Sequence, residues 1–299
     1  MSLKQLTALF ALGALWGASY IFIRVAVTPI GPVMLMFLRA ALTAAILLGY
    51  ASLRGLPLDI RAHWRKFLVL GFFGSALPFT LIAWAELTVT GSMAAILMST
   101  TPLFTAFVAA VGLGEPLTPH KLIGALLGIV GVSITVGGSP LALNPEVIAA
   151  TLALLAATLS YATGGVFAKR FFRGVDNLSM STGQLLSAAI ILAPFSALDL
   201  PVYEVSAVVA LATFGLVLLC TAVAYQLYYY LIISAGPLQA LTVTLLIPVF
   251  GVIWGALLLD EIISPGMIAG LLIVLVSVGL VTGMIAPGKP LRQPFGGSE

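Results

Sequence analysis

Charged side chains are rare in this sequence of 299 residues: Asp, Glu, Lys and Arg make up 8% of it, while hydrophobic residues make up 61%. Soluble globular domains carry about 25% charged residues. Together with a mean hydropathy of +1.18, this scarcity excludes a water-soluble globule. It predicts an integral membrane protein whose main partner is the lipid bilayer.

Residues that build metal, redox and nucleotide sites are also scarce. Cys220 is the only cysteine, which excludes an intramolecular disulfide and a cysteine-based metal cluster. The two histidines, His63 and His120, fall in predicted loops beside basic residues. No glycine-rich loop ends in Lys followed by Ser or Thr, as an ATPase requires. We expect no metal, no cofactor and no enzymatic activity, because paired intramembrane His, Asp or Glu residues are missing as well.

Long apolar runs fill most of the chain instead. A membrane-spanning helix needs about 20 mostly apolar residues. A β-barrel is excluded, because barrel strands alternate apolar and polar residues and runs such as 122–136 do not. We interpret the first run, which has no clear cleavage site, as a retained helix rather than a signal peptide. The ten predicted helices cover residues 5–26, 32–53, 65–86, 91–112, 118–138, 146–168, 178–198, 205–234, 237–259 and 265–285.

Basic residues gather in the gaps on one side of these helices. Lys and Arg precede the first helix and follow the second, fourth, sixth and tenth, whereas the opposite gaps carry acidic residues. Because short cytoplasmic loops are enriched in Lys and Arg, both termini are predicted to be cytoplasmic. The same placement explains the excess of Lys and Arg over Asp and Glu, so no nucleic-acid partner is needed to account for it.

The second half of the sequence repeats the first. Proline, glutamate and glycine positions recur 146 residues later, and the recurring pairs are Pro102 and Pro248, Glu115 and Glu261, Gly124 and Gly270, and Gly137 and Gly283. Because each copy holds five helices, an odd number, the two copies insert with opposite orientations. The predicted fold is an all-α integral membrane protein, with ten transmembrane helices as two inverted five-helix repeats around a central cavity. Residues 1–140 form the first repeat and 141–286 the second, and 287–299 are a disordered cytoplasmic tail.

These residues resemble a known family. The stretches 114–117 (GEPL) and 260–261 (DE), together with 15–19 (LWGAS), are similar to the paired repeats of the drug/metabolite transporter superfamily. Among its ten-helix members, the chain most resembles the EamA-type exporters, the group that contains the YddG-type aromatic amino-acid exporters. The resemblance implies a basket-like bundle in the bacterial inner membrane, with a cavity lined mainly by helices 1, 3, 4, 6, 8 and 9. The second Glu turn departs from the first, with Asp260 in place of Gly114 and Ile262 in place of Pro116.

Aromatic and hydroxyl side chains inside the predicted helices are candidates for the cavity surface. An apolar pocket with a few hydroxyl and amide groups suits a neutral or zwitterionic molecule with an apolar body. On helix 8, Tyr225 with Tyr229 and Gln226 with Tyr230 have the four-residue spacing that shares a helix face. Core packing and interfacial aromatic belts are the competing interpretations. The predicted substrate-contacting residues are Trp16, Tyr20, Phe79, Thr80, Trp84, Met98, Thr101, Tyr161, Tyr225, Gln226, Tyr229 and Thr244.

Pro102 and Pro248 occupy equivalent positions in helices 4 and 9. Each removes a backbone hydrogen bond and frees a carbonyl about one turn earlier, near Met98 and Thr244, where a substrate amine could bind. Prolines in membrane helices often only shape packing. Because the kink recurs in both copies, we predict that the two prolines are gating hinges.

Arg39 is the only clear charge within a predicted helix interior. It could pair with a substrate carboxylate. We favour a structural role, in which it extends to the membrane surface or bonds helix-end carbonyls, because helix 2 resembles a peripheral brace.

Ion-coupled carriers commonly use a carboxylate buried within the bilayer. Here Glu86, Glu115, Asp260 and Glu261 all fall at helix ends. We therefore predict an exporter of amino acids, aromatic ones included, and related small metabolites, which works by alternating access without ion coupling.

Several alternatives stay open at this point. Efflux of drugs or metabolites coupled to protons is one. An importer of phosphorylated solutes would need several cavity Lys or Arg residues, and a membrane-embedded enzyme would need intramembrane catalytic groups. A scaffold would not need Tyr and Gln stripes. We expect a monomer, but the glycines spaced about four apart suit either internal packing of helices 5 and 10 or a dimer.

Overall fold

The computed structural model describes residues 1–198 and 204–285. All regular structure in these ranges is helical, and ten helical segments there are long and apolar enough to cross a membrane. They correspond one for one to the ten predicted segments. The protein is therefore an all-α integral membrane protein. The predicted tail at 287–299 lies outside the described residues.

The first five spans contain one interruption and one irregular helix. The third span passes through a π-helical turn, and the fourth is divided into two helices. The elements are α1 (Leu3–Ile30), α2 (Pro32–Leu53), η1 (Arg61–His63), α3 (Trp64–Gly71), η2 (Phe72–Ala76), α4 (Leu77–Ala85), α5 (Gly91–Met98), α6 (Thr101–Leu113) and α7 (Pro119–Gly137).

The last five spans repeat this plan. The eighth span passes through a π-helical turn, and a short helix precedes the ninth. The elements are α8 (Pro145–Phe171), α9 (Asn177–Ser196), α10 (Ala207–Val217), η3 (Leu218–Val223), α11 (Ala224–Ala235), α12 (Pro237–Leu241), α13 (Val243–Leu258) and α14 (Pro265–Thr282).

Local sequence explains where the helices begin and turn. The eighth span begins after Ser206, whose side chain accepts a hydrogen bond from the Val209 backbone N–H. At the two Glu turns the backbone is left-handed at equivalent positions, with φ of 70° at Gly114 and 50° at Asp260. Aspartate is one of the few residues that tolerate this conformation. The replacement of Gly114 by Asp260 in the second copy therefore preserves the turn.

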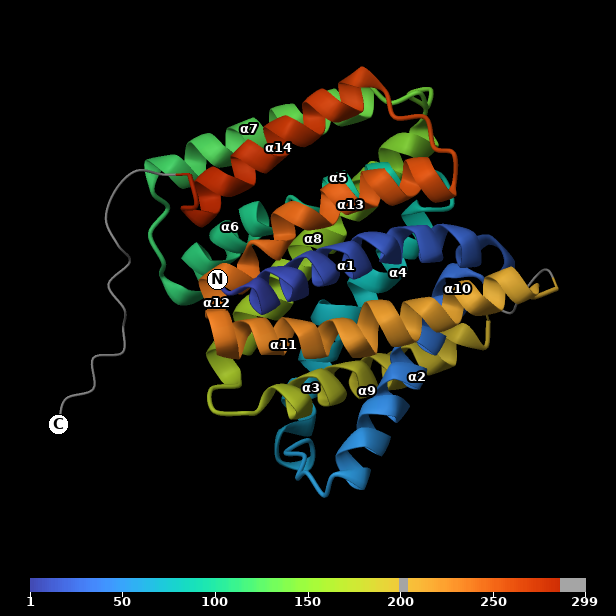
Figure 1. The fold of residues 1–299 in the computed structure, drawn as a ribbon, viewed down its shortest axis with the longest axis vertical. Helices are drawn as coiled ribbons and strands as arrows, with labels where there is room; N and C mark the ends of the chain where they lie inside the picture. Colours follow the sequence, from blue (N-terminus) through green and yellow to red (C-terminus); the bar gives the residue numbers. More distant parts are fainter. Residues whose placement is uncertain (199–203, 286–299) are drawn as a thin grey trace.

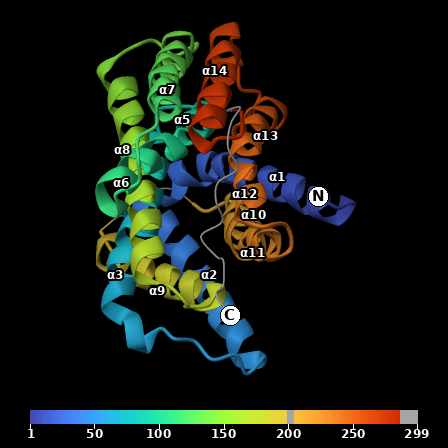
Figure 2. The same cartoon turned by 90° about the vertical axis from the view of Figure 1, so that its left-hand side faces the viewer.

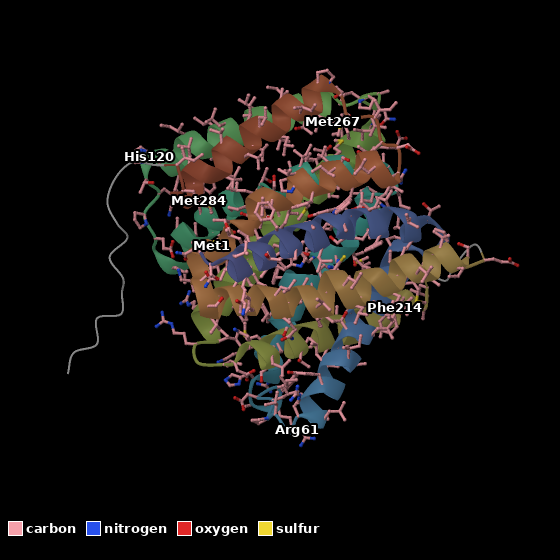
Figure 3. All side chains as sticks on the ribbon, in the orientation of Figure 1. Met1, Arg61, His120, Phe214, Met267 and Met284 are labelled. Carbon is pink, nitrogen blue, oxygen red and sulfur yellow. The ribbon has the colours of Figure 1, made fainter. Side chains whose placement is uncertain are left out.

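The helices form a bundle with both described chain ends on the same side. Met1, His120 and Met284 lie at one end (Figure 3), which we call the terminal end, and the opposite end is the distal end. Helix α1 runs away from the terminal end, whereas its repeat partner α8 runs toward it (Figure 1). α7 and α14 pack together at one edge of the bundle, and α2 and α9 pack together at the opposite edge (Figure 2).

Glycines allow α7 and α14 to approach closely. A Cβ added at Gly124 would lie 2.5 Å from Val281, and one added at Gly131 would lie 2.7 Å from Val274. The hydroxyl of Ser277 also donates to the Gly124 carbonyl at 2.6 Å. The glycine spacing that left internal packing and a dimer open is thus used to pack two helices of one chain.

The two π-helical turns lie at equivalent positions in the repeat. η2 begins at Phe72 and η3 begins 146 residues later, at Leu218. Such turns widen a helix and are frequent at functional sites. They place two equivalent hydroxyl residues, Ser75 and Thr221, in the interior of the bundle, where both are buried.

Candidate substrate-binding site

A cavity of about 430 Å³ lies between the two copies. Its volume falls within the range of roughly 300–1,000 Å³ that is usual for small-molecule pockets. Much of its lining comes in repeat pairs, among them Trp16 with Tyr161, Phe79 with Tyr225, and Met98 with Thr244. The cavity therefore lies where the two inverted copies face each other.

Aromatic rings form two groups on the cavity wall. The Trp16 ring centroid lies 6.5 Å from that of Tyr225 and 5.3 Å from that of Tyr228. The rings of Phe79 and Tyr161 meet edge to face at 6.3 Å. Such surfaces provide apolar area with a few hydroxyl groups, which suits an amphiphilic ligand.

Most of the residues predicted to contact substrate line this cavity. They are Trp16, Tyr20, Phe79, Met98, Thr101, Tyr161, Tyr225 and Thr244, and Pro102 lines it with them. Their contact with a substrate stays a prediction.

Three of the predicted residues lie elsewhere. Thr80 donates its hydroxyl to the Ala76 carbonyl at 2.8 Å, and Trp84 is 44% exposed. On α4 the cavity-facing positions are instead Phe79 and Ile82. Gln226 is exposed in a shallow surface depression, because one step along a helix from Tyr225 turns the side chain by about 100°. The side chain of Tyr229 lies outside the described part of the chain.

Arg39 lines the cavity and is buried, so its predicted extension to the membrane surface was wrong. Its side chain is only 8% exposed. The guanidinium carbon lies 4.0 Å from the Phe79 ring centroid, and Nε donates to the Thr221 hydroxyl at 3.1 Å. Helix α2 is therefore part of the cavity wall rather than only a brace.

Gln184 on α9 is the counterpart of Arg39 in the second copy. Its amide nitrogen donates to the Gly74 carbonyl at 2.9 Å and to the Ser75 hydroxyl at 2.8 Å. In both copies, a polar side chain from an edge helix thus bonds a hydroxyl in the π-helical turn of the other copy. Sequence reasoning missed Gln184, although its offset of 145 from Arg39 marks the only such polar pair in these two helices.

The two prolines do not form equivalent kinks in this state. Helix α5 ends at Met98 and Pro102 lies in the first turn of α6, whereas Pro248 lies inside the continuous helix α13. The carbonyl that Pro102 frees already has a partner, because the Thr101 hydroxyl donates to the Met98 oxygen at 2.7 Å. The two copies therefore share a sequence pattern but differ in conformation.

The distal end of the cavity is closed by close contacts between the copies. A Cβ added at Gly17 would lie 2.8 Å from the Gly251 nitrogen, and one added at Gly251 would overlap Ala95. The Glu261 carboxylate accepts hydrogen bonds from the backbone N–H groups of Gly91 and Ser92, at 2.8 and 2.9 Å. A carboxylate at the N-terminus of α5 is favourable, because it satisfies free N–H groups and meets the positive end of the helix dipole. We call the residues in these contacts the distal gate.

The equivalent turn at the terminal end has different partners. The Glu115 carboxylate pairs with Lys169 of α8 at 2.7 Å. The hydrogen bond from Lys169 lowers the pKa of Glu115 below its ordinary value. The cavity lining extends toward this end, to Leu70, Ala168 and Leu241. The structure is thus closed at the distal end and faces the terminal end.

Glu86, which follows α4 at the distal end, is completely buried. Neither of its carboxylate oxygens has a hydrogen-bond partner among the described residues. Its backbone carbonyl, in contrast, accepts a hydrogen bond from the Arg24 guanidinium. Glu86 thus lies at a helix end, as predicted, but in the protein interior. The position of a carboxylate at a helix end is therefore no ground for expecting uncoupled transport.

Sequence comparison identifies the family. The sequence model of the EamA-like transporter family matches twice, at residues 3–137 and 148–283. The chain belongs to the EamA-like transporter family. The two matches agree with a duplicated body of five spans per copy, so the chain is a membrane transporter with an EamA-like inverted repeat.

Relatives of this EamA-like chain match it over nearly its whole length. It is 28% identical to the "Uncharacterized inner membrane transporter YedA" of Escherichia coli, over 96% of this chain and 94% of that protein. It is 25% identical to a "Probable amino-acid metabolite efflux pump" of Escherichia coli, over 87% of this chain and 89% of the other. A protein of known crystal structure has the same fold, with a TM-score of 0.66, 19% identity, and coverage of 95% of this chain and 98% of its own.

Proposed function

We propose that this transporter exports amino acids, aromatic ones included, and related small amphiphilic metabolites by alternating access. The observation that carries the proposal is Arg39, the only charged residue among the described residues that line the cavity. Its side chain is buried, and it takes part in neither of the ion pairs that the described residues form. A carboxylate on the substrate would pair with this cation inside the cavity.

The rest of the cavity suits the remainder of an amino acid. The rings of Trp16, Phe79 and Tyr161 provide apolar area for a side chain, aromatic or aliphatic. A phosphorylated solute carries more negative charge than one guanidinium neutralises, so the cavity favours a singly charged carboxylate over a phosphate ester. Export as the direction is supported by the name of the Escherichia coli efflux relative.

The two Glu turns have different partners in this structure, and this difference supports alternating access. In this state Glu261 holds the N-terminus of α5 while Arg24 bonds the Glu86 carbonyl. Arg24 is the repeat counterpart of Lys169, which pairs with Glu115. Opening of the distal gate would release Glu261 from α5 and leave it free to pair with Arg24. Two inverted copies can in this way exchange conformations and expose one cavity to either side in turn.

Transport by the purified protein in liposomes tests the proposal. We expect flux of radiolabelled amino acids, fastest for those with large apolar side chains, measured with and without a pH gradient. The amine made by removing the carboxyl group of phenylalanine serves as the matched non-substrate. Zero flux for every amino acid would overturn the proposed substrate class.

Replacement of Pro102 by alanine tests the hinge. Restoring the backbone N–H would favour a continuous helix across Ser99 and Thr100, where the fourth span is now interrupted. We expect amino-acid flux to fall roughly tenfold with little loss of folded protein, because the interruption is needed in only one access state. The hinge would be ruled out if Pro102→Ala kept the wild-type amino-acid flux and the wild-type distances between spin labels placed on the two sides of the distal gate.

A further inference from the structure

A buried acid lies next to the distal gate, and its side chain takes no part in the transport scheme proposed above. Glu86 is 0% exposed, and both carboxylate oxygens lack a hydrogen-bond partner among the described residues. Burying an ionised carboxylate without partners is costly, and such a group is held neutral by a proton instead. The geometry alone therefore favours the protonated acid in the state in which the gate is closed.

The charged and titratable groups around Glu86 come from three other elements. Helix α1 contributes Tyr20 and Arg24, helix α2 contributes Arg39, and the turn before α14 contributes Glu261. Burial raises the pKa of Glu86 well above its ordinary value, the negative charge of Glu261 raises it further, and Arg24 and Arg39 oppose the shift. Both carboxylate oxygens of Glu261 accept backbone hydrogen bonds from α5 in the closed gate, so a second negative charge beside this carboxylate would work against closure.

We propose that Glu86 is a proton-binding site of the distal gate, which holds the gate closed when protonated and favours its opening when the proton leaves. The inference rests on the alternating access proposed above. The step is a simple acid dissociation: the carboxyl O–H bond breaks, the proton passes to water at the distal end, and the carboxylate keeps the electron pair. Water that enters the open gate stabilises this anion.

The sign of the pH dependence follows from linkage. The closed gate binds the proton more tightly than the open gate does, so acid stabilises the closed gate. As pH rises above the pKa of the solvated acid, about 4.5, the fraction of molecules with a closed gate falls. The open-to-closed ratio then rises up to tenfold per pH unit, until the pH reaches the higher pKa of the closed state.

Spin labels across the gate measure this population. Leu87 and Ile262 are 40% and 72% exposed on the two sides of the gate. Both are replaced by cysteine in a Cys220→Ala background, labelled, and placed in lipid nanodiscs. The distances between the two labels are measured by electron–electron double resonance from pH 5 to pH 8 without substrate. A long distance corresponds to an open gate, and we expect the fraction of molecules with the long distance to grow as pH rises.

Variants decide whether Glu86 is the group that titrates. Glu86→Gln mimics the protonated acid, and we expect the short distance at every pH. Glu86→Ile reproduces the repeat counterpart Ile232 and is also uncharged at every pH. It should give the same short distance, and it takes the place of the amide variant if that variant folds poorly. Glu115→Gln is the matched control at the terminal end and should keep the wild-type pH dependence.

Two outcomes would overturn the inference. One is a wild-type distribution that does not change with pH, and the other is a pH dependence that persists in both Glu86 variants. The measurement involves no amino acid, so it is independent of the proposed substrate class. Absence of amino-acid flux with a pH-sensitive gate would reject the substrate, whereas flux with a pH-insensitive gate would reject the proton site.

Discussion

Replacement of Arg39 by alanine is expected to lower the transport efficiency for phenylalanine roughly 100-fold. Truncating one partner of a buried charge pair costs about 2–5 kcal/mol, and about 3 kcal/mol corresponds to this loss. The effect should depend on the carboxylate of the substrate, because Arg39 is the charge that faces it. Flux of phenylalanine is therefore compared with flux of its decarboxylated amine, in liposomes, for the wild type and the variant.

The expected signature is a loss of discrimination rather than a general loss of activity. Wild-type protein should prefer the acid over the amine, and Arg39→Ala should not. Gln184→Ala, at the equivalent position of the second copy, removes a neutral group that bonds Ser75, and it should retain the preference for the acid. Arg39→Lys keeps the charge but not the Thr221 contact through Nε, so we expect an intermediate result. Wild-type discrimination in Arg39→Ala would exclude the carboxylate site.

Replacement of Gly251 by alanine is expected to prevent the distal gate from closing. The new Cβ would overlap Ala95 in the closed gate, where α13 and α5 are in direct contact. Overpacking of this kind costs about 1–3 kcal/mol, which lowers the closed-to-open ratio roughly 5- to 150-fold. The spin-label pair at Leu87 and Ile262 should show the long distance, and transport should fall because the terminal-facing state is rarely reached.

Two controls separate this clash from the general effect of adding a methyl group. Gly49→Ala places a Cβ where nothing lies within 4 Å, and we expect wild-type distances and flux. Ala95→Gly, combined with Gly251→Ala, removes the atom that is overlapped and should restore closure in part, since a helix glycine costs about 1 kcal/mol. A short gate distance in Gly251→Ala alone would show that the closed gate is not the packing described here.

The fold was predictable because lipid restricts the chain to a few solutions. Apolar runs of sufficient length mark the spans, and capping residues such as Ser206 mark where they begin. The recurrence of Glu115 as Glu261 identified the duplication, and an odd number of spans per copy gave the inversion. These features depend on the composition of each segment and on the number of spans per copy, and both can be read from the sequence alone.

The cavity was predictable only in part, because hydropathy does not show which face of a helix meets its neighbours. Phe79 and Tyr225 were placed in the cavity by their mid-span positions, but the same reasoning included Trp84 and Gln226, which lie outside it. Arg39 was assigned to the surface because α2 resembled a brace. Its pairing with Gln184 across the repeat is the signal that would have placed it in the cavity.

Two further features depend on the access state, which the sequence does not encode directly. Pro102 and Pro248 are equivalent in sequence, but one precedes a helix and the other lies inside one. Two equivalent copies with opposite orientations must differ in conformation wherever the cavity faces one side only. The burial of Glu86 arises in the same way, because the closed gate covers a turn that composition alone assigns to the surface.

Counterflow tests the central claim, that one cavity with a bound carboxylate is exposed to the two sides in turn. Liposomes that contain the purified protein are loaded with unlabelled phenylalanine and diluted into trace labelled phenylalanine. We expect label to accumulate transiently above its equilibrium level in wild-type liposomes, and we expect Arg39→Ala to remove this overshoot. Simple equilibration without an overshoot in the wild type would indicate an open channel instead of a carrier with one alternately exposed cavity.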